Sequence, residues 1–428
     1  MFKKPLQIVT RLLYISFLPV LFLLASISRL KKTKNRRPSL VWGSLPIINN
    51  SYWSFAMSSF GYLSKTYVNS YYSINKREDW DRVLKEEYIF IPKYFKPLFA
   101  FADSLFKFDI FFISYQGFFL NSTPIQFFQA QILKFAGKKI VVIPYGSDAY
   151  SYRYIRSTSW LHSLNISYPA ASRKQRSISR TVDYWNRYAD AVIPGVMGFD
   201  GIGRCDVLSP SSLVLDLKKW TTGRNKSSAN GMDAPVVVAH SPNHRGCKGT
   251  EFITKAVDQL KEEGLKIELR LVEGVKNDEV QNILCDNTDI LIEQLIFTGH
   301  GLSGLEGMAS GLPTISNLED EEYTLPLRRW SYLDECPLVS ATPENIVDIL
   351  RKLVTNPQLR DDLGKAGRKY VEKYHGYDSA HYLFSNVIDY IYGKKESIIN
   401  LYHPILGDYP NRSPKIDHPL VKNRIVDL

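Results

Sequence analysis

The 428-residue sequence predicts an α/β protein with two doubly wound parallel-sheet domains facing each other across a cleft, preceded by an apolar membrane segment. Continuous apolar runs bounded by Gly or Pro suit strands that are buried on both faces, as in parallel sheets. These runs alternate with helical stretches, which is typical of doubly wound sheets. A polar, glycine-containing segment at 221–234 separates two such series, and we interpret it as a domain linker.

The N-terminus predicts attachment to a membrane. Residues 12–28 carry no charge, and these 17 residues lie near the lower limit for spanning a bilayer. Six basic residues follow at 29–37 and should resist translocation. A cleaved signal peptide ending near Ser26-Ile27-Ser28 is less favoured for this reason. A signal anchor and a monotopic insertion both remain open, and either places the following domains on the cytoplasmic side of the cell membrane.

The net charge of +11 is concentrated at this end of the chain. Residues 1–37 hold nine Lys or Arg and no acid, so the other 45 basic residues nearly balance the 43 acidic ones and leave +2. A basic stretch beside an apolar segment indicates a membrane surface and argues against nucleic acid as a partner. The four cysteines lack metal-type spacing and are expected to be reduced thiols.

The first domain is expected over 38–220, after an anchor and basic collar at 1–37. Its elements follow from short apolar runs and amphipathic stretches. Strands are expected at 39–48, 108–114, 139–144 and 190–194, and helices at 123–135 and 171–188.

The second domain is expected over 235–375 and repeats the alternation. A C-terminal helix at 376–393 is expected to pack back on the first domain, and the tail at 394–428 either drapes over the surface or is disordered. Strands are expected at 235–239, 266–272, 289–293 and 314–316, and helices at 249–263, 278–285, 345–354, 358–375 and 379–392.

A basic loop follows the first strand of the second domain and opens its first helix, with the sequence His240-Ser-Pro-Asn-His-Arg-Gly-Cys-Lys-Gly-Thr-Glu251. This is the phosphate-binding position of a doubly wound sheet. Arg245 and Lys248 are spaced to reach one dianion together, Arg as a planar fork and Lys as a point charge. A solvated basic loop is the alternative, but the position at a strand end favours phosphate binding.

A glycine-rich loop at 299–304 leads into a short helix that carries Glu306. Glycines let the backbone approach a ligand closely, and the start of a helix offers free N–H groups to an anion. A carboxylate one or two turns into the helix suits the hydroxyls of a ribose. The loop therefore predicts a site for a nucleotide with phosphate and sugar.

Together the two motifs resemble the GT-B glycosyltransferases of family 4, the "glycosyl transferases group 1" type. The resemblance rests on Arg-x-x-Lys-Gly after a strand, followed downstream by Gly-x-Gly-x-x-x-Leu-Glu-x-Met-Ala-x-Gly-x-Pro. It is strongest over 235–317 and weaker over 38–393. It implies that Arg245 and Lys248 hold the donor diphosphate and act in catalysis, and that Glu306 binds the ribose. It also implies donor contacts from the backbone of the loop residues Gly301, Leu302, Ser303 and Gly304.

One position departs from the family pattern. Members commonly carry two glutamates spaced E-x7-E, and the first falls here on Thr298, which has no carboxylate. That first acid contacts the donor sugar in many members, so the resemblance leaves the donor sugar undefined. The acids of the preceding strand, Asp289 and Glu293, could compensate but are expected to be structural.

In the first domain, Asp148 is a candidate catalytic residue. It lies in Pro144-Tyr-Gly-Ser-Asp-Ala149, directly after a strand, where the related family often carries a His in place of Tyr145. Asp148 either orients or deprotonates an acceptor hydroxyl, or caps the next helix, since Ser and Asp are good N-caps.

The resemblance implies transfer of a sugar from a nucleotide-diphosphate sugar to a saccharide or lipid-linked saccharide, with retained anomeric configuration, in surface polysaccharide biosynthesis. No metal or cofactor is expected, because no histidine cluster occurs and no Asp-x-Asp pair falls in a cleft position. Basic groups and helix N-termini would then neutralise the phosphates.

Two other classes of protein fit the sequence less well. A dinucleotide-binding dehydrogenase is excluded because Gly-x-Gly-x-x-Gly does not follow the first strand. A catalytically degenerate GT-B protein that acts as a subunit or scaffold remains the alternative, because Thr298 and Tyr145 depart from the family pattern.

Overall fold

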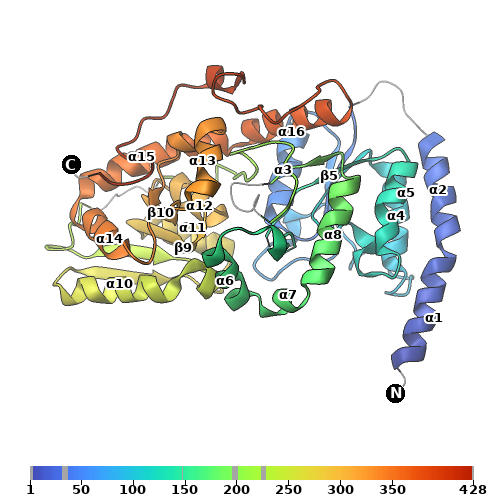
Figure 1. Cartoon of the computed structure of the whole chain (residues 1–428), viewed down its shortest axis with the longest axis horizontal. Helices are drawn as coiled ribbons and strands as arrows, with labels where there is room; N and C mark the ends of the chain where they lie inside the picture. Colours follow the sequence, from blue (N-terminus) through green and yellow to red (C-terminus); the bar gives the residue numbers. More distant parts are fainter. Residues whose placement is uncertain (1–2, 31–36, 147, 195–200, 223–227, 427–428) are drawn as a thin grey trace. The chain divides into compact units, whose positions relative to one another are not determined.

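The computed structural model describes residues 3–30, 37–146, 148–194, 201–222 and 228–426 (Figure 1). Most of the basic collar and the middle of the expected linker 221–234 lie outside these residues.

The chain folds into two compact units, each assembled from discontinuous segments. The first unit comprises Met1–Ala149, Arg176–Ile193 and Phe384–Glu396, and the second comprises Tyr150–Gln175, Pro194–Leu383 and Ser397–Leu428. These units differ from the expected domains 38–220 and 235–375, because 150–175 and 194–220 group with the second unit.

The first unit contains a six-stranded sheet formed by β1 (Leu40–Ser44), β2 (Ser64–Val68), β3 (Arg82–Val83), β4 (Ile110–Ile113), β5 (Lys139–Val142) and β6 (Ala191–Val192). The strand order is β3-β2-β1-β4-β5-β6, and every pair is parallel. Central β1 places Leu40 opposite Ser64 and Ile110. Its residues are all buried, as expected for a strand covered on both faces.

Helices accompany this sheet, and two more precede it at the N-terminus (Figure 1). The aromatic core joins segments far apart in sequence: Trp42 stacks on Phe112 with 3.8 Å between ring centroids, and Phe384 lies 4.9 Å from Trp42. The helices are α1 (Lys3–Ser16), α2 (Leu18–Leu30), α3 (Ile48–Ser59), α4 (Lys96–Lys107), α5 (Gln129–Phe135), α8 (Gln175–Tyr188) and the end of α16 (Tyr377–Ile391), with short turns η1 (Arg77–Asp79), η2 (Phe119–Ser122) and η3 (Gln126–Phe128).

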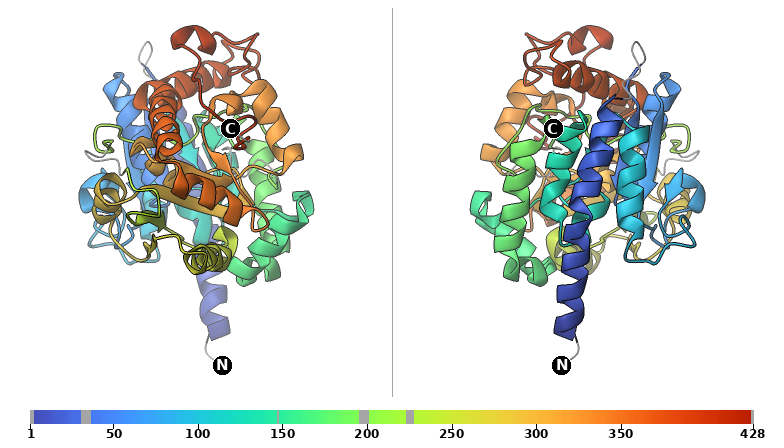
Figure 2. Two further views of the ribbon diagram at one scale, coloured as in Figure 1. Left: turned by 90° about the vertical axis from the view of Figure 1, so that its left-hand side faces the viewer. Right: turned by 90° about the vertical axis from the view of Figure 1, so that its right-hand side faces the viewer.

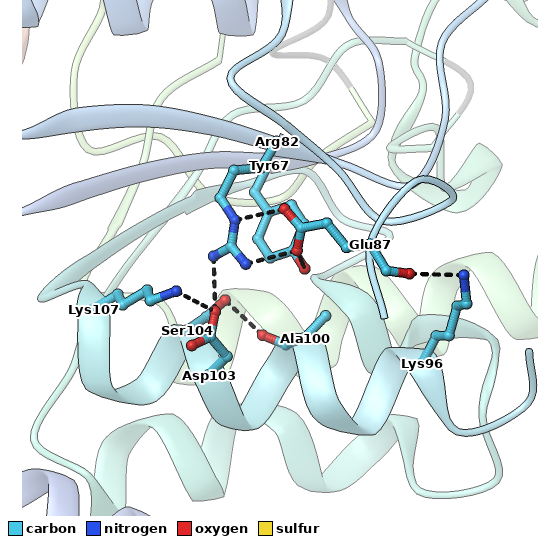
Figure 3. A network of polar contacts seen from close by, with 8 residues as sticks. All are labelled: Tyr67, Arg82, Glu87, Lys96, Ala100, Asp103, Ser104 and Lys107. Atoms are coloured by element: carbon cyan, nitrogen blue, oxygen red, sulfur yellow. Dashed lines mark hydrogen bonds and ion pairs between the residues drawn. The ribbon is translucent and has the colours of Figure 1, made fainter. Parts of the chain in front are cut away.

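A polar network fastens edge strand β3 to α4 (Figure 3). Arg82 donates two hydrogen bonds to Glu87, of 2.8 and 2.7 Å, and a third of 2.8 Å to Asp103. Tyr67 donates to the same Glu87 carboxylate at 2.8 Å, and Lys107 donates to Asp103 at 2.9 Å. Bidentate pairing of this kind restrains the geometry of the side chains in addition to pairing their charges. The start of the segment that follows β3 is therefore held rigidly against α4.

The second unit contains a five-stranded parallel sheet formed by β7 (Val236–His240), β8 (Ile267–Leu271), β9 (Ile290–Thr298), β10 (Thr314–Asn317) and β11 (Val339–Ser340). The strand order is β11-β10-β9-β7-β8, so β7 and β9 lie side by side. Residues Val238, Ile253, Ile292, Ile315 and Leu350 belong to one buried apolar cluster.

The helices of this unit are α6 (Thr158–Ser167), α7 (Pro169–Arg173), α9 (Arg245–Lys248), α10 (Thr250–Glu262), α11 (Asn277–Asp286), α12 (Leu302–Ala309), α13 (Glu321–Trp330), α14 (Ile346–Thr355), α15 (Pro357–Tyr374) and the start of α16, with turns η4 (Tyr152–Tyr154), η5 (Leu333–Glu335) and η6 (Tyr409–Arg412).

The C-terminal tail packs on the second unit and is not disordered over its described residues. Tyr402 and Tyr409 are buried, and Ile416 N–H donates to Glu335 at 3.1 Å. The same carboxylate accepts from Lys373 at 2.8 Å, and both partners of this pair are buried.

Several expected elements differ in extent. The helix expected at 123–135 begins at Gln129, because the residues before it form short 3₁₀ turns. The helix expected at 171–188 is split at Lys174 into α7 and α8. Strand β9 extends to Thr298, five residues beyond the expected end at 293.

Candidate functional site

The carboxyl end of β7 is tied to its neighbours by His240. This buried imidazole lies between the Ile292 carbonyl, 2.7 Å from Nδ1, and the Thr250 hydroxyl, 2.9 Å from Nε2. Burial lowers the pKa of His240 to about 4, so the ring is neutral. It therefore sets the position of the basic loop relative to β9.

Two glycines in this loop are needed for its path. Gly249 has a φ of +72° and ends α9, a conformation that favours glycine. A Cβ on Gly246 would lie 2.7 Å from Ile166 Cγ2, because α6 passes over α9. Cys247 N–H also donates to Ser167 of α6, at 3.0 Å. The segment 150–175 thus forms one wall of the basic loop.

Arg245 lies at the outer side of the loop. Its side chain is 61% exposed and forms a bidentate pair with Glu273, which follows β8. The hydrogen bonds to Glu273 raise the pKa of Arg245, so it stays charged. An exposed ion pair contributes little to stability. Arg245 can therefore exchange Glu273 for an anionic ligand.

Lys248 lies inward and is buried, with a side chain only 8% exposed. Its ammonium donates to Gln294 at 2.8 Å and to Glu293 at 3.3 Å. Both partners come from the middle of β9, so this strand holds the buried cation that α9 supplies.

Glu293 connects this cation to the glycine-rich loop. One carboxylate oxygen, Oε1, accepts from Gly301 N–H at 2.8 Å, from the Ser303 hydroxyl at 3.0 Å and from Lys248. The other, Oε2, is buried and has no partner among the described residues. A Cβ on Gly304 would lie 2.1 Å from Oε2, so any larger residue there would displace the Glu293 carboxylate. The carboxylate therefore occupies the start of α12, where a helix favours an anion.

The rest of the loop is held by β9 and β10. The Gln294 amide donates to the Gly299 carbonyl at 2.8 Å, and Ser316 donates to the same carbonyl at 2.5 Å. Gly299 N–H donates to the Asn317 carbonyl at 2.9 Å. The glycine-rich loop is thus fixed at both its beginning and its end.

His300 belongs to this loop and is buried, and its ring is 5.5 Å from that of His375. Neither ring nitrogen of His300 has a partner in the described part of the chain. Burial lowers the pKa of His300, and burial together with His300 lowers the pKa of His375 to about 3. Both imidazoles are therefore neutral.

Glu306 lies on α12 with 7% of its surface exposed. Burial is the main cause that raises its pKa to about 8, Glu293 raises it further, and Lys248 opposes the shift. Its carboxyl is therefore mostly protonated at neutral pH and can donate one hydrogen bond as well as accept others.

This shift predicts how stability changes with pH. Because the pKa of Glu306 is near 8 in the folded chain and 4.5 ordinarily, the folded state binds the proton more tightly. The resulting stabilisation is complete at pH values below the pKa of Glu306 in the unfolded chain. It is lost as the pH rises through the pKa of Glu306 in the folded chain. Wild-type protein is therefore expected to lose more thermal stability than Glu306→Gln between about pH 5 and pH 8. Parallel unfolding profiles for the two proteins would contradict this assignment.

Thr298 ends β9 and is mostly buried, so no carboxylate stands at that position. Asp289 accepts from Val237 N–H at 2.8 Å and ties the starts of two strands together, which is the structural role expected for it. Glu293 is also held by its neighbours, two residues of the glycine-rich loop and Lys248, and so fixes the loop relative to the basic residue.

Asp148 lies in the first unit, beyond the ends of β4 and β5. Its carboxylate accepts from the N–H groups of Tyr115 at 3.0 Å, Tyr145 at 3.2 Å and Gly146 at 3.1 Å. No helix begins directly after it, so it joins two loops rather than capping a helix. Burial raises its pKa to about 7, against these backbone hydrogen bonds. A small pocket beside it is lined by Ser114, Tyr145 and residues after β1.

The second unit thus brings together most of the residues predicted for the donor. Lys248, Gly301, Ser303 and Gly304 surround Glu293, and Glu306 lies one turn further along α12. Arg245 is turned towards Glu273 instead. Sequence reasoning gave Glu293 a structural role and overlooked Gln294, although two adjacent polar residues inside an apolar strand were a usable signal. Among the described residues, no three His, Cys, Asp or Glu side chains are arranged to hold a metal ion.

Three solved structures share this architecture. Sucrose-phosphate synthase from Thermosynechococcus elongatus gives a TM-score of 0.50 at 11% identity, over 84% of this chain and 100% of its own. HepE from Anabaena, in complex with UDP and glucose, gives a TM-score of 0.51 at 10% identity, over 82% of this chain and 100% of its own. An α-glucosyltransferase in complex with UDP and a 13-mer DNA gives a TM-score of 0.50 at 11% identity, over 83% of this chain and 99% of its own.

At these identities the similarity establishes the fold. The protein has the GT-B architecture of two parallel-sheet α/β domains, which confirms the predicted fold class. No protein-family model matches the chain, and no curated protein matches its sequence.

Proposed function

We propose that the protein is a glycosyltransferase that moves a sugar from a nucleotide-diphosphate sugar to a saccharide or lipid-linked saccharide. One observation carries the proposal: on a GT-B fold, a buried lysine, the start of α12 and a buried acid one turn later meet at the ends of β7 and β9. Since HepE has been solved with UDP and with UDP-glucose, UDP-sugars are the first donors to test.

In this proposal the donor diphosphate lies between the basic loop and α12. An ammonium has three N–H donors, and the contacts with Glu293 and Gln294 use two of those of Lys248. The third can reach a phosphate oxygen, while Arg245 exchanges Glu273 for the ligand. Backbone amides of 301–304 face the same charge, and Glu306 pairs with the ribose hydroxyls. Charge building up on the leaving diphosphate is thereby stabilised by groups already in place.

The finer features of the proposal follow the family 4 resemblance. Transfer would retain the anomeric configuration, serve synthesis of a surface polysaccharide, and take place at the cytoplasmic face of the cell membrane. Asp148 would orient or deprotonate the acceptor hydroxyl. Because Arg245, Lys248 and the amides of α12 supply positive charge, transfer is expected to persist in the presence of a chelator.

A panel of nucleotides in thermal unfolding tests the donor site. Saturation at 100 times Kd stabilises a folded protein by about 2.7 kcal/mol, so UDP should raise the unfolding temperature more than uridine does. Donor hydrolysis and transfer to membrane extracts should follow with the matching UDP-sugar. If no nucleoside diphosphate stabilises the protein and no nucleotide sugar turns over, the proposal fails.

A catalytically degenerate GT-B subunit or scaffold is the second candidate. It is favoured by the neutralisation of both cations, Arg245 by Glu273 and Lys248 by Glu293, and by Thr298 in place of an acid. Such a protein would bind a UDP-sugar without releasing UDP in the presence of any acceptor. Measured turnover therefore separates the two candidates.

A further inference from the structure

Helix α2 packs along the first unit, whereas the N-terminal part of α1 extends beyond it (Figures 1 and 2). Buried residues Leu21 and Ala25 face α4 and α5, and Ser28 donates a hydrogen bond to the Leu105 carbonyl. The Phe22 and Phe135 rings lie 5.6 Å apart, edge to face. The right-hand view of Figure 2 shows these helices, in dark blue, across the outer side of α4 and α5. The segment Thr10–Leu30 is long and apolar enough to cross a membrane, by length and composition only.

Its opposite side is apolar and open to solvent. Leu12 is 62% exposed, Leu23 60% and Leu30 85%. Spacings of eleven and seven residues place these three on one side of a nearly continuous helix. Val20 and Ile27 widen the same surface. Contiguous exposed apolar surface of this kind marks an interaction site.

A second apolar element lies beside α1. A turn from Tyr88 to Ile91, closed by a 2.9 Å hydrogen bond, presents Ile89 and Phe90, which are 79% and 100% exposed. Turns favour Gly, Asn, Asp and Pro at such positions. Tyr88 also has a φ of +52°, which is unusual for a bulky residue. The turn therefore exposes two large apolar side chains at positions where turns usually carry small or polar residues.

The segment that carries this turn has a rigid base and touches the N-terminal helix a few residues further on, at Tyr94 and Phe95. Lys96 donates to the Glu87 carbonyl at 2.7 Å and joins the two ends of the segment, next to the Arg82 network (Figure 3). On the helix side, Tyr14 donates to the Tyr94 carbonyl, and the Phe17 and Phe95 rings are 5.8 Å apart. The exposed turn therefore lies on a braced segment beside the N-terminal helix.

Exposed basic residues lie beside this surface. Arg11, Arg29 and Lys93 are exposed. The first 37 residues contain nine basic residues and no acid. Basic residues near apolar side chains are attracted to the anionic lipids of a cytoplasmic leaflet.

We propose that α1, α2 and the turn at 88–91 form one surface that lies in the plane of an anionic bilayer, with Ile89 and Phe90 inserted among the lipids, rather than a helix that spans the bilayer. A spanning orientation would place α4 and α5, with the charged side chains of Lys107 and Lys134, in hydrocarbon. The proposal goes beyond the proposed function, because it holds whether or not the protein transfers a sugar.

Sedimentation of the full chain with vesicles tests the proposal. Vesicles of phosphatidylcholine with about a third phosphatidylglycerol should bind the protein, and pure phosphatidylcholine should bind it much less. The double variant I89S/F90S should bind at least about tenfold more weakly, given the apolar area that it removes. The matched control I405S/L406S alters two apolar residues that are 85% and 70% exposed in the second unit, and should bind as wild type does.

Extraction of native membranes distinguishes the two orientations. Protein lying in the plane of the bilayer should be released by alkaline carbonate, whereas a spanning helix stays in the pellet. Resistance to carbonate overturns the proposal. Unchanged vesicle binding by I89S/F90S also overturns it, as does self-association that this variant abolishes without any binding to vesicles.

Discussion

Replacing Lys248 with methionine is expected to lower kcat/KM for sugar transfer by at least about 100-fold, as loss of one positioned donor to a developing charge typically does. Lys248 is the buried cation that adjoins both the basic loop and α12. Methionine keeps the apolar part of the lysine side chain and removes only the charge and the hydrogen-bond donors of the ammonium group. The measurement is steady-state transfer with the donor that the nucleotide panel selects. Lys261→Met on the exposed side of α10 is the matched control and should retain full activity.

Stability must be separated from chemistry in this variant. Removing one partner of a buried ion pair costs about 3–5 kcal/mol, because the other charge is left unpaired. The double variant K248M/E293Q removes both charges, and its glutamine keeps an acceptor for Gly301 N–H and Ser303. We expect the double variant to regain stability but not activity. Recovery of both would show that Lys248 serves only to balance Glu293.

Replacing Gly304 with alanine is expected to weaken nucleotide binding by about tenfold or more and to lower stability by about 1–3 kcal/mol, the usual range for overpacking. The added Cβ would lie 2.1 Å from Glu293 Oε2 and 3.0 Å from its Cδ. Glu293 cannot move away without losing its hydrogen bonds to Gly301 and Ser303. The amides that we assign to the diphosphate would therefore be displaced.

Gly376→Ala is the matched control for this substitution. A Cβ there would lie 3.2 Å from Leu217 Cδ1, the end of a flexible side chain, so only small effects are expected. Calorimetric titration of nucleotide into both variants makes the comparison. Equal affinities for the two variants would show that the position of Glu293 does not matter for nucleotide binding.

The parts of the fold that the sequence predicted well are those with strong local signals. Strands such as β7 and β5 are short apolar runs between turn residues, and they appear where expected. The Arg245 and Lys248 spacing and the glycines before α12 placed both loops at strand ends, which parallel topology brings to one edge of a sheet.

Other features depend on tertiary contacts that carry no local signal. Residues 150–175 follow a strand of the first sheet, yet α6 packs over α9 because Gly246 leaves room for Ile166. The sequence named Glu293 but could not identify its partners. Its partners, Lys248 and Gly301, lie 45 residues before it and eight residues after it in sequence. Likewise, composition alone could not tell a spanning helix from one packed on α4 and α5.

The most direct test of the donor site is calorimetric titration of UDP and uridine into wild-type protein and K248M/E293Q. If the panel selects another base, that nucleoside and its diphosphate take their place. We predict that wild type binds the diphosphate at least about tenfold more tightly than the double variant does, a difference of about 1.4 kcal/mol, while the nucleoside binds both proteins equally. Equal affinity of the diphosphate for the two proteins would contradict the assignment of Lys248 to the donor diphosphate.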